Sequence, residues 1–482
     1  MEVVLVILQA CVVIGAIVLG VRVGGIGLGL WGVVGTAILV FVFRLPPGSP
    51  PVDAFFIIIA VITASSAMQA AGGIDFLVSI ASRIIQRNPR RLTYVAPLVA
   101  FVFTVLSGTS NIFFALIPVI YETAYRNGQR PERALAASTV TSGLGITASP
   151  VSAAMAAYLV LVEAKGFGLP QVLLITVPSA IVACVVTSFV QQRIGRELVA
   201  DPEFRKRVDA GTVQVPAALE SSYAQATASS GTASSDAASA VATGKGKAAR
   251  AAAADTDPVD HTVPAGGKTA AWIFIVGTLL VVALGLFPAL RPAFPDANGD
   301  LQPIGMSPVI EMVMFTVALV IILVRKVKPS LVVEQPLLRS GYVAAVALFG
   351  IAWMADTFIS ANQKTIIEPL GQLITAQPLL LAVALFLVAG LTTSQSATTN
   401  TLIPIALAAG LAPGVVTAMW PSLIGVWLFP ANGSQIAAVE TDRTGTTHLT
   451  PVPIWHSFTI PMLVSWVSVV VTGLLIQLVV PF

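Results

Sequence analysis

Long apolar runs separated by short polar connections occupy most of the chain. The uninterrupted runs are about 20 residues long, the length an α-helix needs to cross the ~30 Å hydrocarbon core of a bilayer. The pattern therefore predicts an all-α polytopic membrane protein. The first run has no basic segment before it, so we expect a retained span rather than a cleaved signal peptide. The predicted spans lie near 3–20, 25–43, 54–72, 170–191, 269–289, 306–325, 339–355 and 455–479.

Four other apolar stretches are interrupted by polar residues. At about 92–126 and about 378–411, two arms that are each too short to cross flank a polar tip, which predicts re-entrant hairpins. Stretches at about 133–162 and about 414–439 contain Gly, Pro or Asn near their middle, which predicts broken spans. Non-helical backbone at membrane depth is tolerated only where protein or a water-filled cavity shields it. The interruptions are therefore expected to meet inside the protein.

The order of these elements repeats. Residues 1–195 and 269–482 each read as three spans, a hairpin, a broken span and a final span. Each half thus crosses five times, an odd number, so the two halves must have opposite orientations. We expect two inverted-topology repeats with about ten transmembrane helices and two re-entrant hairpins, an organisation typical of secondary transporters.

Residues 196–268 differ from the rest of the chain. They are rich in Ala, Ser, Thr and Gly and contain few large apolar side chains. Such a segment cannot bury enough surface to offset the entropy lost on ordering. The prediction is a disordered cytoplasmic linker between the repeats.

Composition and charge place this protein in the membrane. The chain is 56% hydrophobic and 10% charged, against about 25% charged residues in soluble domains. Lysine and arginine concentrate on one side, which by the positive-inside rule is cytoplasmic and leaves both termini outside. The residues expected outside are Arg44, Lys165, Arg291 and Lys364. Two isolated cysteines offer no disulfide framework or metal motif; no metal, cofactor or nucleic-acid partner is expected.

The polar interruptions are the candidate binding site. Hairpin tips and half-helix N-termini that meet near the midplane offer N–H, O–H and amide donors, which suit an anion. No lysine or arginine lies deep in a predicted span. The candidate substrate-binding residues are Ser107, Gly108, Thr109, Ser110, Asn111, Thr147, Ser149, Ser152, Ser394, Ser396, Thr398, Thr399, Asn400, Asn432 and Ser434.

Other interpretations apply to these residues. A single membrane hydroxyl often packs as a small residue or bonds back to its own helix; clustering in two matching hairpins favours the site. Asp356 either caps the start of an interfacial helix or has a coupling or gating role. The arginines of 83–91 fit a topology signal and contact with lipid headgroups.

Six stretches together resemble the anaerobic C4-dicarboxylate (Dcu) transporter family, over nearly the whole chain except the linker. They are "SAMQAAGGIDFLV" (66–78), "SGTSNI" (107–112), "ITASPVSAA" (146–154), "WMADTFIS" (353–360), "SQSATTNTLIPIALAAG" (394–410) and "AAVETDRTGTTHL" (437–449). The resemblance implies a bacterial plasma-membrane protein that carries fumarate, succinate, malate or aspartate, with fumarate–succinate antiport as the family's typical role. The long linker departs from the compact family pattern. It offers a place where a regulatory partner could bind.

Several functions remain as alternatives. We expect alternating access by a mobile unit against a scaffold that also contacts lipid and forms a homodimer. The nearest rival is a sodium- or proton-coupled dicarboxylate symporter on the same scaffold. An intramembrane hydrolase would need a Ser–His, Ser–Lys or paired carboxylate arrangement at depth, which the sequence does not place there. A passive channel fits two sealed hairpin tips poorly, and a sensor or scaffold role leaves the repeated tips unexplained.

Overall fold

The computed structural model describes residues 2–23, 26–110, 112–229, 266–295, 301–362, 377–429, 432–449 and 454–479. Within these ranges the protein is mostly helical, with one two-stranded antiparallel hairpin. The helices of the first half are α1 (Glu2–Val23), α2 (Gly27–Phe41), α3 (Val52–Ala70), α4 (Gly73–Arg87), η1 (Pro89–Arg91), α5 (Leu92–Ser107), α6 (Ile112–Arg126), α7 (Pro131–Ala148), α8 (Ala153–Glu163) and α9 (Leu169–Gln191).

A short helical segment follows the first half. It contains η2 (Leu198–Ala200), α10 (Pro202–Asp209), η3 (Ala217–Leu219) and α11 (Glu220–Ser229). The elements of the second half are α14 (Gly267–Leu286), η4 (Pro288–Leu290), β1 (Ala293–Pro295), β2 (Leu301–Pro303), α15 (Met306–Arg325), α16 (Pro329–Val333), α17 (Pro336–Ala361), α19 (Leu379–Thr392), α20 (Gln395–Ala408), α21 (Pro413–Met419), η5 (Trp420–Trp427), α22 (Gly433–Thr441) and α23 (Thr459–Val479).

Seven helices in the described ranges are long and apolar enough to cross a membrane, or eight if the bent pair Phe55–Ala70 and Gly73–Arg87 is one span. The bend of 73° in this pair follows Gly72, whose left-handed backbone ends α3 and starts the amphipathic α4. Large apolar side chains such as Leu279 and Leu475 stand exposed on the outer helices, a pattern that a water-soluble surface avoids. The prediction of a helical multi-pass membrane protein is confirmed.

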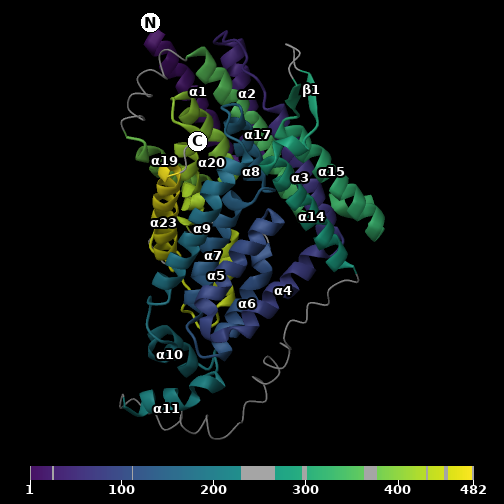
Figure 1. Cartoon of the computed structure of the whole chain (residues 1–482). Coiled ribbons are helices and arrows are strands. Elements are labelled where there is room, and N and C mark those ends of the chain that lie inside the picture. Colours follow the sequence, from purple (N-terminus) through teal and green to yellow (C-terminus); the bar gives the residue numbers. More distant parts are fainter. Residues whose placement is uncertain are drawn as a thin grey trace.

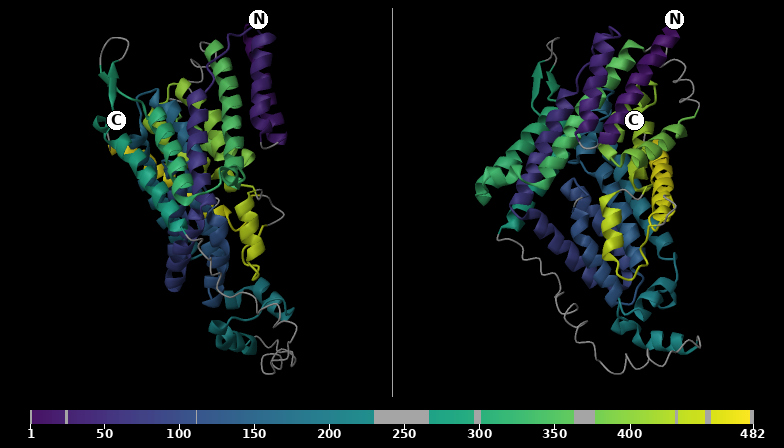
Figure 2. Two further views of the ribbon diagram at one scale, coloured as in Figure 1. Left: turned by 90° about the vertical axis from the view of Figure 1, so that its right-hand side faces the viewer. Right: turned by 180° about the vertical axis from the view of Figure 1, so that it is seen from behind.

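The helices form two groups (Figures 1 and 2). In one group, α1 and α2 pack on α17, and α15 packs on both α3 and α14. In the other, α5 packs on α7, α19 packs on η5, and α9 lies against α23. Contacts between α3 and α8 and between α17 and α20 join the groups. The helices that precede the interruptions, α5, α7, α19 and η5, therefore belong to the second group, and α8 and α20 reach the helices of the first.

The prediction of a disordered linker is wrong for residues 196–229. Asp201 accepts hydrogen bonds from the backbone N–H groups of Glu203 and Phe204 and caps α10, which begins with Pro202. The Phe204 ring is fully buried with Leu198 and Val213. The sequence Asp-Pro-Glu at 201–203 is a typical helix start, but the low hydrophobicity of the whole stretch outweighed this signal in the prediction. Residues 230–265 of the predicted linker lie outside the described residues. Figure 1 places α10 and α11 at the end of the molecule away from the N-terminus.

Candidate functional site

The helical structure is interrupted between α5 and α6, at Ser107–Ser110, where the sequence predicts a hairpin tip. Gly108 ends α5 with φ of 71°, a left-handed conformation that glycine adopts without steric cost. A Cβ atom added at Gly108 would lie 2.4 Å from the carbonyl oxygen of Val151. The tip therefore rests directly on the break between α7 and α8, and only glycine permits this approach.

The break between α7 and α8 is held by its own hydroxyl groups. Ser149 Oγ donates to the carbonyl of Val105 at 2.7 Å, and Ser152 Oγ donates to the carbonyl of Ile146 at 2.7 Å. Ser152 also caps α8 by accepting from the Met155 N–H. Thr147 Oγ1 donates within its own helix to Leu144. These three predicted site residues are buried and support the break through backbone carbonyls rather than facing the cavity.

The second hairpin tip lies between α19 and α20. Thr393 has φ of 50°, and Ser394 caps α20 by accepting from the Ala397 N–H. Thr399 Oγ1 accepts from Trp420 Nε1 at 2.9 Å, while Thr398 Oγ1 donates to the Ser394 carbonyl. The hydroxyls of Thr398 and Thr399 thus fix the first turns of α20 and its contact with η5.

The fourth break separates η5 from α22. Asn432 caps α22: its Oδ1 accepts from the N–H and the hydroxyl of Ser434 at 3.2 and 3.1 Å. Gln435 completes a capping box, and its Nε2 donates to the Trp427 carbonyl at 2.8 Å. Pro430 and Ala431, which directly precede Asn432, lie outside the described residues.

Residues from all four breaks line one cavity of about 350 Å³. The predicted site residues that line it are Ser107, Gly108, Thr109, Ser110, Ser394, Ser396 and Asn432. α3 and α17 also contribute to the wall of the cavity, through residues such as Ser65 and Gly341. No charged side chain is among the described residues that line the cavity, so an anion there would be held by neutral donors.

Some predicted residues are absent from the lining, and some lining residues were missed. Asn111 lies outside the described residues. The predicted residues placed behind the cavity wall are Thr147, Ser149, Ser152, Thr398, Thr399, Asn400 and Ser434. Gly143, Gln395 and Trp427 line the cavity without having been predicted. Gln395 stands within the polar run "SQSATTN" and could have been found; Gly143 and Trp427 carry no such signal.

Asp356 lies away from the cavity. It belongs to α17, which continues to Ala361, so the expectation that it starts an interfacial helix is wrong. Its Oδ2 accepts from the Ser49 N–H at 2.7 Å, and Thr357 Oγ1 accepts from the Gly48 N–H at 3.0 Å. Asp356 therefore fixes the connection between α2 and α3, and a coupling or gating role stays a prediction.

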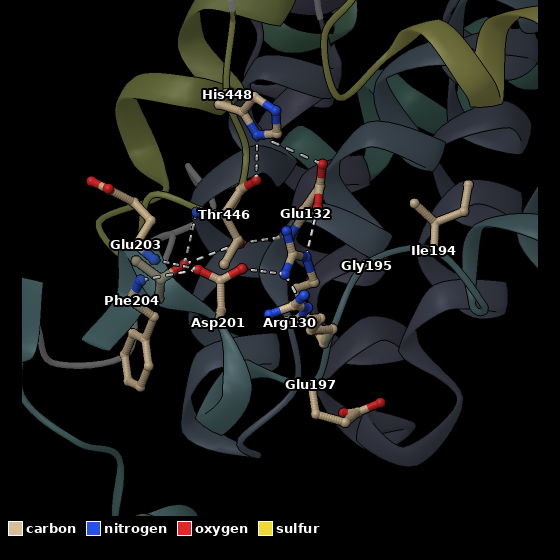
Figure 3. A network of polar contacts seen from close by, with 12 residues as sticks. Arg130, Glu132, Ile194, Gly195, Glu197, Asp201, Glu203, Phe204, Thr446 and His448 are labelled. Atoms are coloured by element: carbon tan, nitrogen blue, oxygen red, sulfur yellow. Dashed lines mark hydrogen bonds and ion pairs between the residues drawn. The ribbon is translucent and has the colours of Figure 1, made fainter. Parts of the chain in front are cut away.

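A second polar cluster joins α7, the 196–229 segment and residues from 442–449 and 454–457 (Figure 3). Arg130 forms buried ion pairs with Glu132 at 2.6 Å and Asp201 at 2.5 Å. Burial opposes the charge of Arg130, but the two carboxylates prevail and raise its pKa. This network ties the start of α7 to the helical segment that follows the first half.

The same cluster brings together a serine, a histidine and a glutamate that the sequence pattern does not predict to meet. Ser457 Oγ lies 3.2 Å from His448 Nδ1, but it donates to Glu132 Oε1 at 2.5 Å. His448 Nδ1 also lies 2.9 Å from the Thr446 carbonyl, so this nitrogen carries a proton and cannot take one from Ser457. A nucleophilic serine requires a histidine base that accepts its proton; this arrangement does not provide one.

His456, which lies just before α23, has a structural role. Its Nε2 lies 3.2 Å from the Leu428 carbonyl, and its Nδ1 accepts from the Phe458 N–H at 3.2 Å. These two contacts fit a neutral ring with the proton on Nε2. Desolvation by burial lowers the pKa of His456. Among the described residues, no group of His, Cys, Asp and Glu side chains could hold a metal ion.

The apolar helices and the polar cavity at four helix breaks define a membrane transporter. A family profile for anaerobic C4-dicarboxylate membrane transporters matches residues 5–481, and the chain belongs to this family. It is therefore a multi-pass protein of a bacterial inner membrane, as predicted.

Relatives share this length. The chain is 34% identical to the anaerobic C4-dicarboxylate transporter DcuB of Escherichia coli over 95% of both chains. It is 31% identical to the C4-dicarboxylate transporter DcuA of Wolinella succinogenes over 94% of this chain and 95% of that one. Among solved structures, MtrF of Neisseria gonorrhoeae, described as one of a class of antimetabolite efflux pumps, aligns with TM-score 0.48 and 11% identity over 93% of this chain and 92% of that chain.

Proposed function

We propose that this protein exchanges C4-dicarboxylates such as fumarate, succinate, malate and aspartate across the inner membrane by alternating access. The main observation in support is that four helix N-termini meet at one cavity, where no charged side chain of the described residues contributes to the lining. α6, α8, α20 and α22 each begin just after a break, and Ser110, Ala153, Gln395 and Asn432 bring those starts to the cavity lining.

Helix N-termini suit the charge of the substrate. Each presents the positive end of a helix dipole and those first-turn N–H groups that its side-chain cap does not take up. Four of them, with the tip hydroxyls, can hold two carboxylates without any lysine or arginine. A site without full counter-charges also releases its anion readily, which a carrier requires on both sides.

We further propose that the two halves are inverted repeats of five crossings each, with re-entrant hairpins at α5–α6 and α19–α20. The contacts between the halves are reciprocal, which supports this topology. The second helix of one half packs on the third of the other, as α2 on α17 and α15 on α3, and the final spans α9 and α23 pack on each other. The homodimer and the regulatory partner at the linker stay predictions.

Counterflow in proteoliposomes tests exchange. Vesicles preloaded with fumarate are expected to take up labelled succinate at least tenfold faster than empty vesicles, with or without a sodium gradient. A carrier whose loaded form reorients and whose empty form does not must behave in this way. Uptake into empty vesicles that requires external sodium or an inward proton gradient would contradict exchange and establish the symporter alternative on the same cavity.

A further inference from the structure

Trp427 presents an unsatisfied hydrogen-bond donor at the cavity. The side chain lies at the end of η5 and is only 2% exposed, yet it contributes to the cavity lining. Its Nε1–H has no hydrogen-bond partner among the described residues. A buried indole N–H without an acceptor is costly and uncommon, because such groups normally find a partner.

Two other tryptophans follow the usual rule, whereas Trp466 Nε1, in α23, also has no partner among the described residues. Trp420, at the start of the same element, donates to Thr399 Oγ1 at 2.9 Å, and Trp353 donates to the Gly48 carbonyl at 2.9 Å. Trp427 thus departs from its neighbour in η5 at the point where η5 reaches the cavity.

Gly143 of α7 lies close beside the indole nitrogen. A Cβ atom added at Gly143 of α7 would lie 3.0 Å from Trp427 Nε1, and Gly143 itself lines the cavity. The Gly143 carbonyl accepts from Gln395 Nε2 at 3.1 Å, so this carbonyl is already engaged by the second hairpin. The absence of a side chain at Gly143 therefore lets α7 lie against the indole edge at the cavity lining.

We propose that the Nε1–H of Trp427 binds the substrate by donating a hydrogen bond to a carboxylate oxygen of the dicarboxylate. An indole nitrogen donates and never accepts, so it favours an anionic oxygen over an ammonium or hydroxyl donor. In a cavity without cations, a donor of this kind distinguishes a second carboxylate from a methyl group. Trp427 therefore contributes to the selection of dicarboxylates over monocarboxylates. This inference rests on the proposed function and assigns one residue to it.

The test compares two phenylalanine substitutions in η5. Trp427→Phe removes the free N–H and keeps an aromatic ring, whereas Trp420→Phe removes an N–H that is satisfied within the protein. Succinate and butyrate binding are measured by isothermal titration on the purified full chain, and succinate–fumarate exchange is measured over a range of concentrations. Melting curves check that each variant is folded.

Trp427→Phe is expected to weaken succinate binding on the order of 10- to 100-fold, the contribution of a hydrogen bond to a charged acceptor. The KM for exchange should rise in step, with a smaller change in kcat, and the preference for succinate over butyrate should fall. Trp420→Phe should leave the succinate Kd within about twofold of wild type, because its N–H does not face substrate. A merely structural role for Trp427 would lower stability and kcat without this loss of selectivity.

Gly143→Ala provides an independent variant if Trp427→Phe does not fold. It leaves the indole in place and inserts a methyl group against Nε1, so it should also weaken succinate binding. Wild-type succinate affinity in a folded Trp427→Phe, or in Gly143→Ala where the first does not fold, overturns the assignment of Trp427 alone. Wild-type protein that neither binds nor exchanges any C4-dicarboxylate overturns the proposed function and this inference with it.

Discussion

Arg130→Met is expected to destabilise the protein by about 3–5 kcal/mol, because breaking a buried ion pair from one side leaves its partner charges uncompensated. The side chain of Arg130 is 8% exposed and contacts both Glu132 and Asp201, whose side chains are buried to a similar extent. Without the guanidinium, two buried carboxylates would face each other with no cation between them. The variant should also detach the 196–229 segment, whose helix α10 is capped by Asp201.

Denaturant titration in mixed micelles, followed by tryptophan fluorescence, measures this loss. Arg126→Met is the matched control, because Arg126 pairs with Glu122 on the surface with 58% and 34% of the side chains exposed. An exposed pair contributes at most about 1 kcal/mol. Asp201→Asn added to Arg130→Met should recover part of the stability by removing one unpaired charge. Equal effects of Arg130→Met and Arg126→Met would show that the network does not hold the segment in place.

Gly108→Ala is expected to abolish exchange, with a loss of stability larger than the left-handed backbone alone explains. The added Cβ would lie 2.4 Å from the Val151 carbonyl, so the first hairpin tip must move away from the α7–α8 break. Moving the tip displaces Ser107–Ser110 from the cavity, and displacements of about 1 Å at a binding site are costly.

Gly166→Ala is the control for the backbone term. Gly166 has φ of 78°, close to the 71° of Gly108, but no atom lies within 4 Å of its added Cβ. Both variants therefore incur the left-handed penalty of about 1–2 kcal/mol, and only Gly108→Ala adds the clash. Exchange kinetics and melting temperature are measured for both in the same lipid. Wild-type exchange by Gly108→Ala would mean that the tip does not need this contact.

The helix breaks carry local signals in the sequence, and the candidate binding site was inferred from those signals. Polar runs such as Ser107–Ser110, bounded by apolar arms, have no place in a continuous membrane helix, and the structure brings the corresponding parts of all four breaks together. Several hydroxyl groups among the candidate binding residues do not line the cavity, and the reason is physical. A helix break exposes backbone carbonyls, and Ser149 and Ser152 satisfy those carbonyls before any substrate arrives.

Other features depend on contacts between distant residues and have no local signal. Trp427 resembles any apolar residue of a membrane helix, and its unsatisfied N–H becomes evident only beside Gly143, far away in the sequence. The fold of the 196–229 segment depends in the same way on the pairing of Asp201 with Arg130 and on the burial of Phe204. The average composition of residues 196–268 predicts disorder, whereas a few long-range contacts order the part from 196 to 229.

Substrate protection of a cysteine placed in the cavity tests whether the dicarboxylate binds there. Ser396→Cys is chosen because Ser396 lines the cavity and is half-buried. The native cysteines provide internal references, since Cys11 is exposed and Cys184 is buried. Once the variant is shown to exchange succinate for fumarate, alkylation by N-ethylmaleimide is followed at each cysteine by mass spectrometry. We predict that saturating fumarate slows labelling of the Ser396→Cys thiol at least tenfold, that butyrate does not, and that Cys11 labels at the same rate throughout. Unchanged labelling in a preparation that still exchanges succinate would contradict the placement of the substrate in this cavity.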